Sequence, residues 1–374
     1  MKTFATLKSM VGKGLKKKQA IGLLFFAALV PTHAAPLDAF LTALPEQMGQ
    51  QAYLEVGADQ MNAQLDFFKI RDSDALAAGT QAGDYHGSHL AGGWRLTDKV
   101  WLSGSLLQRN LSGLSNTYSF DSWQLSGLYK LHEAAGKVPA LAVRLSAWGN
   151  GANEIVATKI CAAPVVGNPT LCQTNALLDK VSIAKPADRD LQVDLIGSWK
   201  PSQNVDINAL LSLGNTQLSF GGLSGLATID GVSYQLSPVG NDILFTAADG
   251  SQRIVKNVYN SSELSWRGNF AQLGVSTTWY HGPWTVRGGY LFYAIQRQAI
   301  DDILKSRGWS VVQQNKTVSL EAAYRLRPHM SVFARGQISS ALIFNDMPVI
   351  YNAFSSDLVG GKYSIYTVGL RADF

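Results

Sequence analysis

The chain has 374 residues and a formal net charge of +5, and only 16% of its residues are charged. That charged fraction lies well below the roughly one quarter that is usual for soluble globular domains. The positive charge comes from six lysines ahead of the first long apolar run, and without them the net charge falls to about −1. The charge therefore gives no support for a nucleic-acid partner. After residue 35, no apolar run approaches the length of about 18 residues that a membrane-spanning helix needs.

The first 34 residues have the organisation of a cleaved signal peptide. Lysines without any acid precede Ala20–Val30, an apolar run of about eleven residues that is too short to span a bilayer as a helix. Pro31 then breaks the helix, and Thr32-His33-Ala34 places small residues where a signal peptidase reads the chain. We expect residues 1–34 to be removed by cleavage after Ala34. The alternative is an amphipathic N-terminal helix of a cytosolic protein.

Residues 35–50 follow a different pattern. Leu37, Phe40, Leu41 and Leu44 recur at the spacing of one helix face. This pattern predicts a short N-terminal periplasmic segment with some helix. A frayed leader without fixed structure is the alternative.

From residue 51 onward, apolar and polar residues alternate in about twelve segments of roughly 9–14 residues, the pattern of β-strands with two unlike faces. The apolar faces of two segments consist of Leu191, Val193, Leu195, Gly197 and Trp199, and of Ala271, Leu273, Val275, Thr277 and Trp279. The opposite face of the first segment carries Gln192, Asp194 and Ser198. A membrane β-barrel shows this alternation because only every second residue faces lipid, and a soluble sandwich shows it as well.

The lengths of the connections separate these two possibilities. Short connections are expected near residues 97–98, 132–137, 201–204, 281–283 and 327–329. Long ones alternate with them, near residues 61–83, 110–117, 150–188, 216–262, 298–313 and 341–360. Strict alternation of short and long connections is typical of outer-membrane barrels, with tight periplasmic turns and long extracellular loops. The pattern predicts an even number of strands, about twelve.

Aromatic residues gather at the predicted ends of the strands, where they would lie in the membrane interfaces. A periplasmic girdle is expected from Trp94, Trp101, Tyr129, Trp199, Trp279, Trp284, Tyr324 and Phe374. Candidates for an outer belt are Trp123, Trp148, Phe292 and Tyr293.

Cys161 and Cys172 are the only cysteines, and both lie in the predicted loop at residues 150–188. In an exported chain this pair predicts one loop disulfide, worth roughly 2–3 kcal/mol by the loop-entropy model. Two thiols without a neighbouring histidine do not indicate a zinc site.

The final residues, Thr367–Phe374, place Leu370, Ala372 and Phe374 on one face of a strand. This segment resembles the closing-strand signal of bacterial outer-membrane β-barrel proteins. The resemblance implies an all-β fold, a transmembrane antiparallel up-and-down β-barrel over residues 51–374, located in the bacterial outer membrane. It also implies contact with outer-membrane lipids and lipopolysaccharide, and recognition by periplasmic chaperones and the barrel-assembly machinery through Phe374.

Charged residues on the polar faces would point into the barrel. The candidates for lining a pore are Arg144, Asp194, Arg287, Glu321, Arg325, Arg335 and Arg371. Four of these are arginines on the last four strands, so one wall is expected to carry a positive ladder that favours anionic solutes. We therefore predict a narrow channel for passive passage of small anionic or zwitterionic solutes. The alternative is a network of ion pairs that stiffens the barrel.

Two further functions remain open at the level of sequence. A lipid-modifying enzyme would need His86 or His89, but their spacing of three puts them on opposite faces of a strand. No hydrolase motif is present, and we predict no catalytic residues, metal site or cofactor. The long loops at residues 150–188 and 216–262 would instead suit a surface or assembly role.

Overall fold

The computed structural model describes residues 51–61, 83–112, 117–134, 138–161, 164–165, 168–172, 177–256, 260–306, 308–341, 345–352, 356 and 360–374. The predicted signal peptide and the segment at residues 35–50 lie outside the described residues, so both stay predictions. In the described part of the chain, no helix is both long enough and apolar enough to cross a bilayer.

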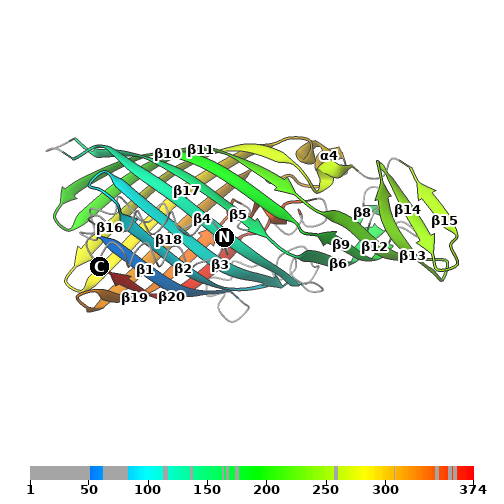
Figure 1. Cartoon of the computed structure of the whole chain (residues 1–374), viewed down its shortest axis with the longest axis horizontal. Coiled ribbons are helices and arrows are strands. Elements are labelled where there is room, and N and C mark those ends of the chain that lie inside the picture. Colours follow the sequence, from blue (N-terminus) through cyan, green and yellow to red (C-terminus); the bar gives the residue numbers. More distant parts are fainter. Residues whose placement is uncertain are drawn as a thin grey trace, which may run out of the picture. The chain divides into compact units, whose positions relative to one another are not determined.

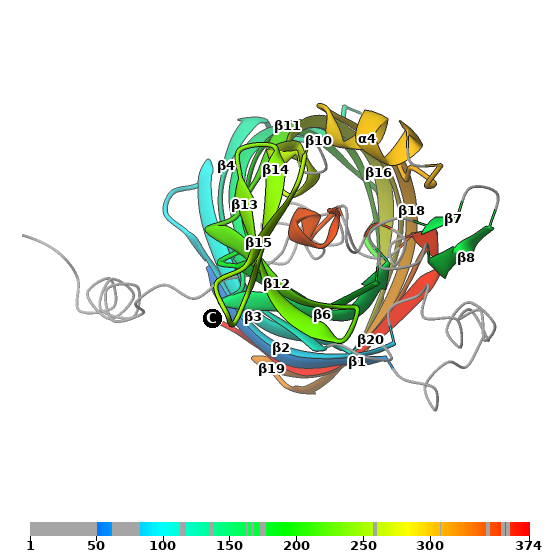
Figure 2. The same cartoon turned by 90° about the vertical axis from the view of Figure 1, so that its right-hand side faces the viewer.

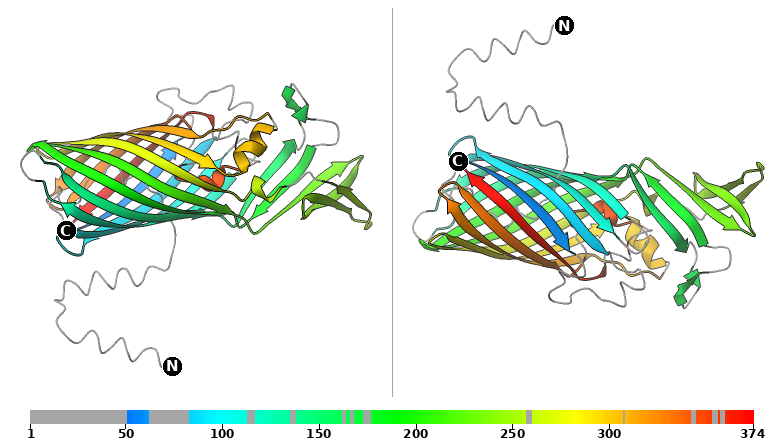
Figure 3. Two further views of the ribbon diagram at one scale, coloured as in Figure 1. Left: turned by 90° about the horizontal axis from the view of Figure 1, so that it is seen from above. Right: turned by 90° about the horizontal axis from the view of Figure 1, so that it is seen from below.

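Twelve antiparallel strands form a closed barrel (Figures 1 and 3). Each strand pairs with the next barrel strand in the chain, and β20 pairs with β1 to close the ring. The barrel strands are β1 (Ala52–Met61), β2 (Asp84–Arg95), β3 (Val100–Ser112), β4 (Thr117–His132), β5 (Ala140–Gly151), β10 (Ala187–Ser202), β11 (Val205–Ser219), β16 (Arg267–His281), β17 (Trp284–Arg297), β18 (Gln314–Arg327), β19 (Met330–Ser339) and β20 (Tyr363–Asp373).

The connections alternate between short and long, as the sequence predicts, with one exception. Ser112 of β3 and Thr117 of β4 are joined by a connection as short as the one between β2 and β3, where the sequence predicted a long loop. The short ones join β2 to β3, β4 to β5, β10 to β11, β16 to β17 and β18 to β19. In outer-membrane barrels the short turns face the periplasm and the long loops face the exterior. We refer to these two ends as the periplasmic and the outer end.

The side chains of the barrel strands divide into an exposed apolar set and a buried polar set. Leu213 is 64% exposed on the outside of β11, whereas Asp194 is 0% exposed on the inside of β10. A closed barrel with apolar residues outside and polar residues inside is the form in which strands cross a bilayer, because every backbone group is paired and only apolar atoms meet lipid. The fold is that of a transmembrane β-barrel.

Beyond the barrel, the two longest outer connections form a second, six-stranded sheet (Figure 1). Its buried face includes Leu178, Val181, Ala227 and Leu236. The sheet, in spatial order, consists of β15 (Gln252–Val255), β14 (Asp242–Ala247), β13 (Val232–Val239), β12 (Gly222–Ile229), β9 (Leu177–Ala184) and β6 (Glu154–Cys161). The strands of this sheet pair as antiparallel hairpins, β6 with β9 and β12 with β13 among them.

The remaining elements are short. Two of them, β7 (Pro164–Val165) and β8 (Asn168–Cys172), pair with each other near the predicted disulfide. The side chains of Cys161 and Cys172 lie outside the described residues, so the disulfide stays a prediction. The helical turns are η3 (Ser261–Glu263), α4 (Ile300–Ser306) and η4 (Pro348–Ile350).

Three aromatic residues that we predicted in the lipid interfaces lie inside the barrel instead. Trp148 is 0% exposed and Tyr293 is 1% exposed, so neither belongs to the outer belt. Trp101 is 5% exposed and its ring stacks on that of Tyr53 at a centroid distance of 6.2 Å. Trp148 has the same strand parity as the buried Arg144, and strand parity decides the face that a residue occupies more strictly than its polarity does.

Candidate functional site

A cavity of about 340 Å³ opens at the periplasmic end of the barrel wall formed by β16 to β20. Three of the predicted pore-lining residues, Arg287, Arg325 and Arg371, border this cavity. Asp373 is the only acid among its lining side chains. The other lining residues are Tyr280, Pro283, Thr285, Ala323, Pro328, His329, Met330, Ser331 and Phe374. We call this space the periplasmic cavity.

The tight turns fix the rim of the periplasmic cavity. Gly282 has a φ of +56°, a backbone conformation that favours glycine, and it lets β16 reverse directly into β17. The amide of Arg325 donates to the carbonyl of Pro283 at 2.9 Å, and the amide of Asp373 donates to that of His329 at 2.9 Å. Backbone hydrogen bonds thus join neighbouring turns, so the rim is a rigid frame for its charged side chains.

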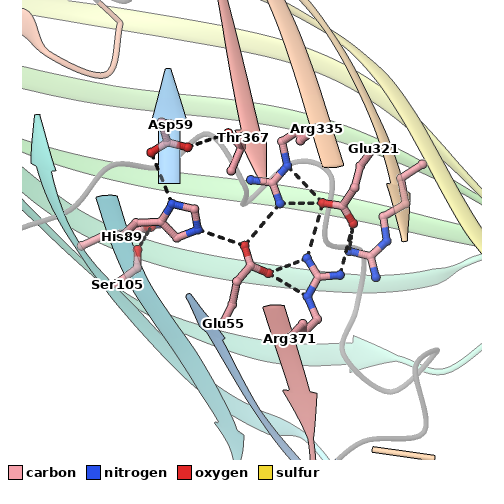
Figure 4. Close-up of polar contacts among 10 residues, drawn as sticks. Glu55, Asp59, His89, Ser105, Glu321, Arg335, Thr367 and Arg371 are labelled. Atoms are coloured by element: carbon pink, nitrogen blue, oxygen red, sulfur yellow. Dashed lines mark hydrogen bonds and ion pairs between the residues drawn. The ribbon is translucent and has the colours of Figure 1, made fainter. Parts of the chain in front are cut away.

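Deeper inside the barrel, a network of ion pairs spans β17 to β20 and β1 (Figure 4). The carboxylate of Glu321 lies 3.5 Å from Arg287, 2.5 Å from Arg335 and 3.1 Å from Arg371. Glu55 of β1 forms ion pairs with two of these arginines, at 2.5 Å from Arg371 and 3.3 Å from Arg335. We call these five residues the seam network, because they cross the junction of β20 and β1.

A histidine extends the seam network toward the outer end. The imidazole of His89 lies 3.2 Å from Glu55 and 3.3 Å from Asp59, and all three side chains are buried. Thr367 donates a hydrogen bond of 2.5 Å to the other oxygen of Asp59. The acids therefore balance the arginines, and the positive ladder expected from β17 to β20 is matched by carboxylates, one of which β1 supplies.

The other predicted site residues separate into one buried pair and one exposed residue. Arg144 of β5 pairs with Asp194 of β10 at 2.5 Å, and both are buried on the barrel interior. Arg325 is exposed at the end of β18, beside the periplasmic cavity. The structure thus places six of the seven candidates in buried ion pairs and leaves Arg325 accessible.

Residues 345–352, which contain η4, fold into the outer half of the barrel. Figure 2 shows this orange-red helical turn inside the ring of strands. The amide of Val349 donates to Asp188 at 2.8 Å, and Asn150 donates to the carbonyl of Asp346 at 2.8 Å. We call residues 345–352 the inner segment, and these contacts fasten it to the wall formed by β5 and β10.

Tyr351 anchors the other end of the inner segment. Trp266 donates a hydrogen bond of 2.7 Å to its carbonyl, and the guanidinium of Arg297 lies 3.6 Å from the centre of its ring. Burial raises the pKa of Tyr351 to about 12. Its hydroxyl therefore stays protonated at neutral pH, and it donates to Asp301 at 3.3 Å. The apolar residues of the inner segment, among them Met347 and Ile350, join a core with Phe120, Trp148 and Tyr293.

Sequence reasoning missed Arg109 on β3. This residue is 1% exposed, and its Nε and Nη1 atoms have no hydrogen-bond partner. It directly opposes Gly87 of β2 and Phe120 of β4. We placed the end of this strand near residue 110, and the inward position of Arg109 follows from its place in the alternation along the strand.

The two histidines considered for an enzyme lie on opposite faces, as their spacing predicts. His86 is exposed, whereas His89 is buried between two carboxylates. Across the described ranges, no group of three or more histidine, cysteine, aspartate or glutamate side chains could hold a metal ion.

Comparison with known proteins finds no matching family model and no matching curated protein. Several solved structures resemble the barrel. The translocator domain of the autotransporter NalP from Neisseria meningitidis is 9% identical, with a TM-score of 0.45, over 87% of this chain and 89% of that chain. The CymD monoaromatic hydrocarbon channel is 11% identical, with a TM-score of 0.41, over 91% of this chain and 98% of that chain.

LpxR from Salmonella typhimurium is also 11% identical, with a TM-score of 0.39, over 86% of this chain and 100% of that chain. The names of these proteins do not describe one common activity, and the sequence identities and TM-scores are all low. They do not indicate what this barrel transports or modifies.

Proposed function

We propose that this protein is a narrow outer-membrane channel for passive passage of small anionic or zwitterionic solutes. The observation that carries the proposal is the periplasmic cavity, where the exposed Arg325 lies beside Arg287 and Arg371 of the seam network, and where Asp373 is the one acid of the lining. Concave, positively charged sites raise the local concentration of anions by focusing the field. Arg325 contributes most directly, because its guanidinium is exposed and belongs to none of the ion pairs described above.

The interior above the cavity supports a narrow path rather than a wide pore. The side chains of the seam network are at most 9% exposed, and the inner segment occupies the outer half. A solute would pass one molecule at a time between fixed charges of both signs. Such a lining suits zwitterions as well as anions, because each charge of the solute meets a partner.

Planar-bilayer recording tests the proposal. The wild-type protein should conduct, and its reversal potential in a salt gradient should show a preference for chloride over potassium. Arg325→Glu should reduce or reverse this preference, because it places a negative charge in the periplasmic cavity. Arg335→Glu is a poor test, because it would set three carboxylates against each other in the seam network.

The matched control is Arg327→Glu, which makes the same charge change at an exposed residue that does not line the cavity. It should leave the ion preference unchanged. Absence of conductance in the wild-type protein, or an equal effect of the two substitutions, would refute the proposal.

Export and assembly complete the proposed function. We propose that residues 1–34 are a signal peptide and that residues 35–50 remain as a short periplasmic segment. Mass spectrometry of the protein purified from outer membranes should give a mature chain that starts at Ala35. Phe374 is 67% exposed at the end of β20, which supports its recognition by the periplasmic assembly machinery. Phe374→Ser should slow membrane insertion without changing the conductance of the inserted protein.

We further propose a disulfide between Cys161 and Cys172. The backbones of β7 and β8 pair Pro164 with Cys172, and Cys161 ends β6 three residues before Pro164. A Cys161→Ser variant should gain a thiol that reacts with maleimide, whereas the wild-type protein should react only after reduction.

The outer sheet carries a second candidate function, a binding surface for a molecule at the cell exterior. It exposes several large apolar side chains to solvent, including Val239 (58%) and Ile254 (59%). Removal of residues 231–256 should abolish such binding in a cell-surface assay and leave the conductance intact. A loss of conductance would instead assign these residues to the channel.

A further inference from the structure

Two arginines lie in one row across three neighbouring strands, on the outside of the barrel at its outer end. Arg189 of β10 directly opposes Gln217 of β11, and Gln217 in turn opposes Arg267 of β16. Neighbouring strands lie about 4.8 Å apart, so the two arginines are separated by about 10 Å at the backbone. We call these three residues the rim row. The three strands are neighbours in the barrel wall, because β11 pairs with β10 on one side and with β16 on the other.

Strand parity and burial show that the rim row faces outward. All three side chains are exposed, while their neighbours on the same strands, Asp188, Thr216 and Trp266, are buried in the interior. Within the described residues, neither Arg189 nor Arg267 has a hydrogen bond or an ion pair from its guanidinium. Two positive charges thus project from the membrane-facing side of the wall without a partner among the described residues.

The rim row lies on the outer side of the apolar belt. The next outward residue on β10 is Leu191, which is 58% exposed. On β11 and β16 the next outward residues are Asn215 and Asn269, and the belt begins beyond them, with Leu213 at 64% and Leu273 at 59%. On the other side of Arg189, the indole of Trp123 covers Gly149, where an added Cβ would lie 2.9 Å from the indole nitrogen. Tryptophan prefers the headgroup level of a bilayer. The rim row therefore meets the polar heads of outer-leaflet lipids.

The surrounding surface favours an anion. In the described strands β10, β11, β16 and β17, no aspartate or glutamate occupies an outward position. The outward residues next to the rim row are neutral hydrogen-bonding groups, among them Asn215, Asn269 and Gln296. A lipid with a positively charged or neutral head would gain little here, whereas a phosphate would gain charge-assisted hydrogen bonds.

We propose that the rim row binds the phosphate groups of a phosphorylated glycolipid in the outer leaflet. The guanidinium groups of Arg189 and Arg267 each donate hydrogen bonds to a phosphate oxygen. The side-chain amide of Gln217, which lies between the two arginines, donates a further hydrogen bond to a phosphate oxygen. The acyl chains of the lipid then lie against Leu191, Leu213 and Leu273. Arginine suits this task because its planar fork matches phosphate geometry and it remains charged at the membrane surface.

Native mass spectrometry of the detergent-solubilised protein tests the site. The probes are diphosphoryl lipid A, monophosphoryl lipid A and phosphatidylglycerol, each titrated in the same detergent. The wild-type protein should bind diphosphoryl lipid A most tightly. The double variant Arg189→Gln/Arg267→Gln should bind it about tenfold or more weakly, because two charge-assisted contacts are lost. Arg327→Gln, which removes an exposed arginine at the opposite end, should bind like the wild type.

Several outcomes would overturn the proposal. Equal affinity for the three lipids would show a site without phosphate recognition. Unchanged binding in the double variant would place the lipid elsewhere. Full competition by millimolar inorganic phosphate would show a site for soluble phosphate rather than for a lipid head. The channel proposal is independent of this site, and the double variant should conduct like the wild-type protein.

Discussion

At the scale of single residues, the barrel interior depends on a few close approaches. Gly93 faces Tyr53 and Trp101, whose rings stack beside it. A Cβ at this position would lie 2.6 Å from the ring of Tyr53 and 2.7 Å from the indole nitrogen of Trp101. Neither ring can move far in a closed wall, so the position requires glycine.

Gly93→Ala should therefore destabilise the barrel, by about 1–3 kcal/mol as expected for overpacking. Gly197→Ala provides the control, because nothing lies within 4 Å of a Cβ added there. Urea unfolding of both variants in lipid vesicles, followed by tryptophan fluorescence, measures the difference. Equal free energies of unfolding would contradict the account of Gly93.

A second residue-scale prediction concerns buried charge. Two guanidinium nitrogens of Arg109, Nε and Nη1, have no hydrogen-bond partner among the described residues, whereas Arg144 pairs with Asp194. Arg109→Met should raise the free energy of unfolding by about 2 kcal/mol, because it removes two buried donors that have no hydrogen-bond partner in the described part of the chain. Arg144→Met should lower it by about 3–5 kcal/mol, because it leaves the buried carboxylate of Asp194 without its cation. The same unfolding assay compares them, and effects of the same sign would refute the assignment.

The sequence correctly predicts whether a side chain faces the barrel interior or the lipid where the alternation along a strand alone decides it. Asp194 and Leu213 lie inside and outside as their parity predicts. It failed where the partner is distant in the chain, as for the contact between Arg371 and Glu55, which are separated by 316 positions. It also failed for Trp148, because the interior beside the inner segment is apolar and accepts a tryptophan that we expected at the lipid interface.

At the scale of elements, the inner segment is the part most able to control passage. Asp188 accepts hydrogen bonds from the amide of Val349 and from the amide and side chain of Asn150. These bonds hold the segment against one wall of the barrel. The sequence predicted a long loop at residues 341–360. It did not predict that part of this loop folds into the barrel, because no periodic pattern marks the segment.

Asp188→Ala should release the inner segment and raise the single-channel conductance about twofold or more, as widening of a constriction would. Asp179→Ala is the control. It removes a carboxylate at the outer end whose described partner is Thr228 of the outer sheet. Planar-bilayer recordings of both variants measure the effect. Unchanged conductance in Asp188→Ala would mean that the inner segment does not limit passage.

At the scale of the whole molecule, the barrel closes where its most distant strands meet. Eight register pairs join β1 to β20, and the seam network reinforces this junction from inside. Glu55 contributes the carboxylate that crosses from β1 to the arginines of β19 and β20. The seam is thus held by backbone hydrogen bonds in the wall and by ion pairs in the interior.

Glu55→Ala should lower the free energy of unfolding by about 3–5 kcal/mol, because it leaves Arg371 and Arg335 buried with less negative charge. The folded band on unboiled gels should then be lost at a lower temperature than in the wild-type protein. Glu133→Ala, at an exposed turn beside Lys130, should behave like the wild type. An unaltered gel transition in Glu55→Ala would show that the backbone pairs alone hold the seam.

Closure also brings two distant parts of the chain into contact. The amide of Gln51 donates to the carbonyl of Phe374 at 2.8 Å, and the amide of Phe374 donates to the carbonyl of Ala52 at 2.8 Å. A short linker could therefore join residue 374 to residue 51, and the chain could be cut at a different periplasmic turn, such as the one at Gly282. The circularly permuted polypeptide would keep every neighbour in the cylinder while changing which strand leaves the ribosome first.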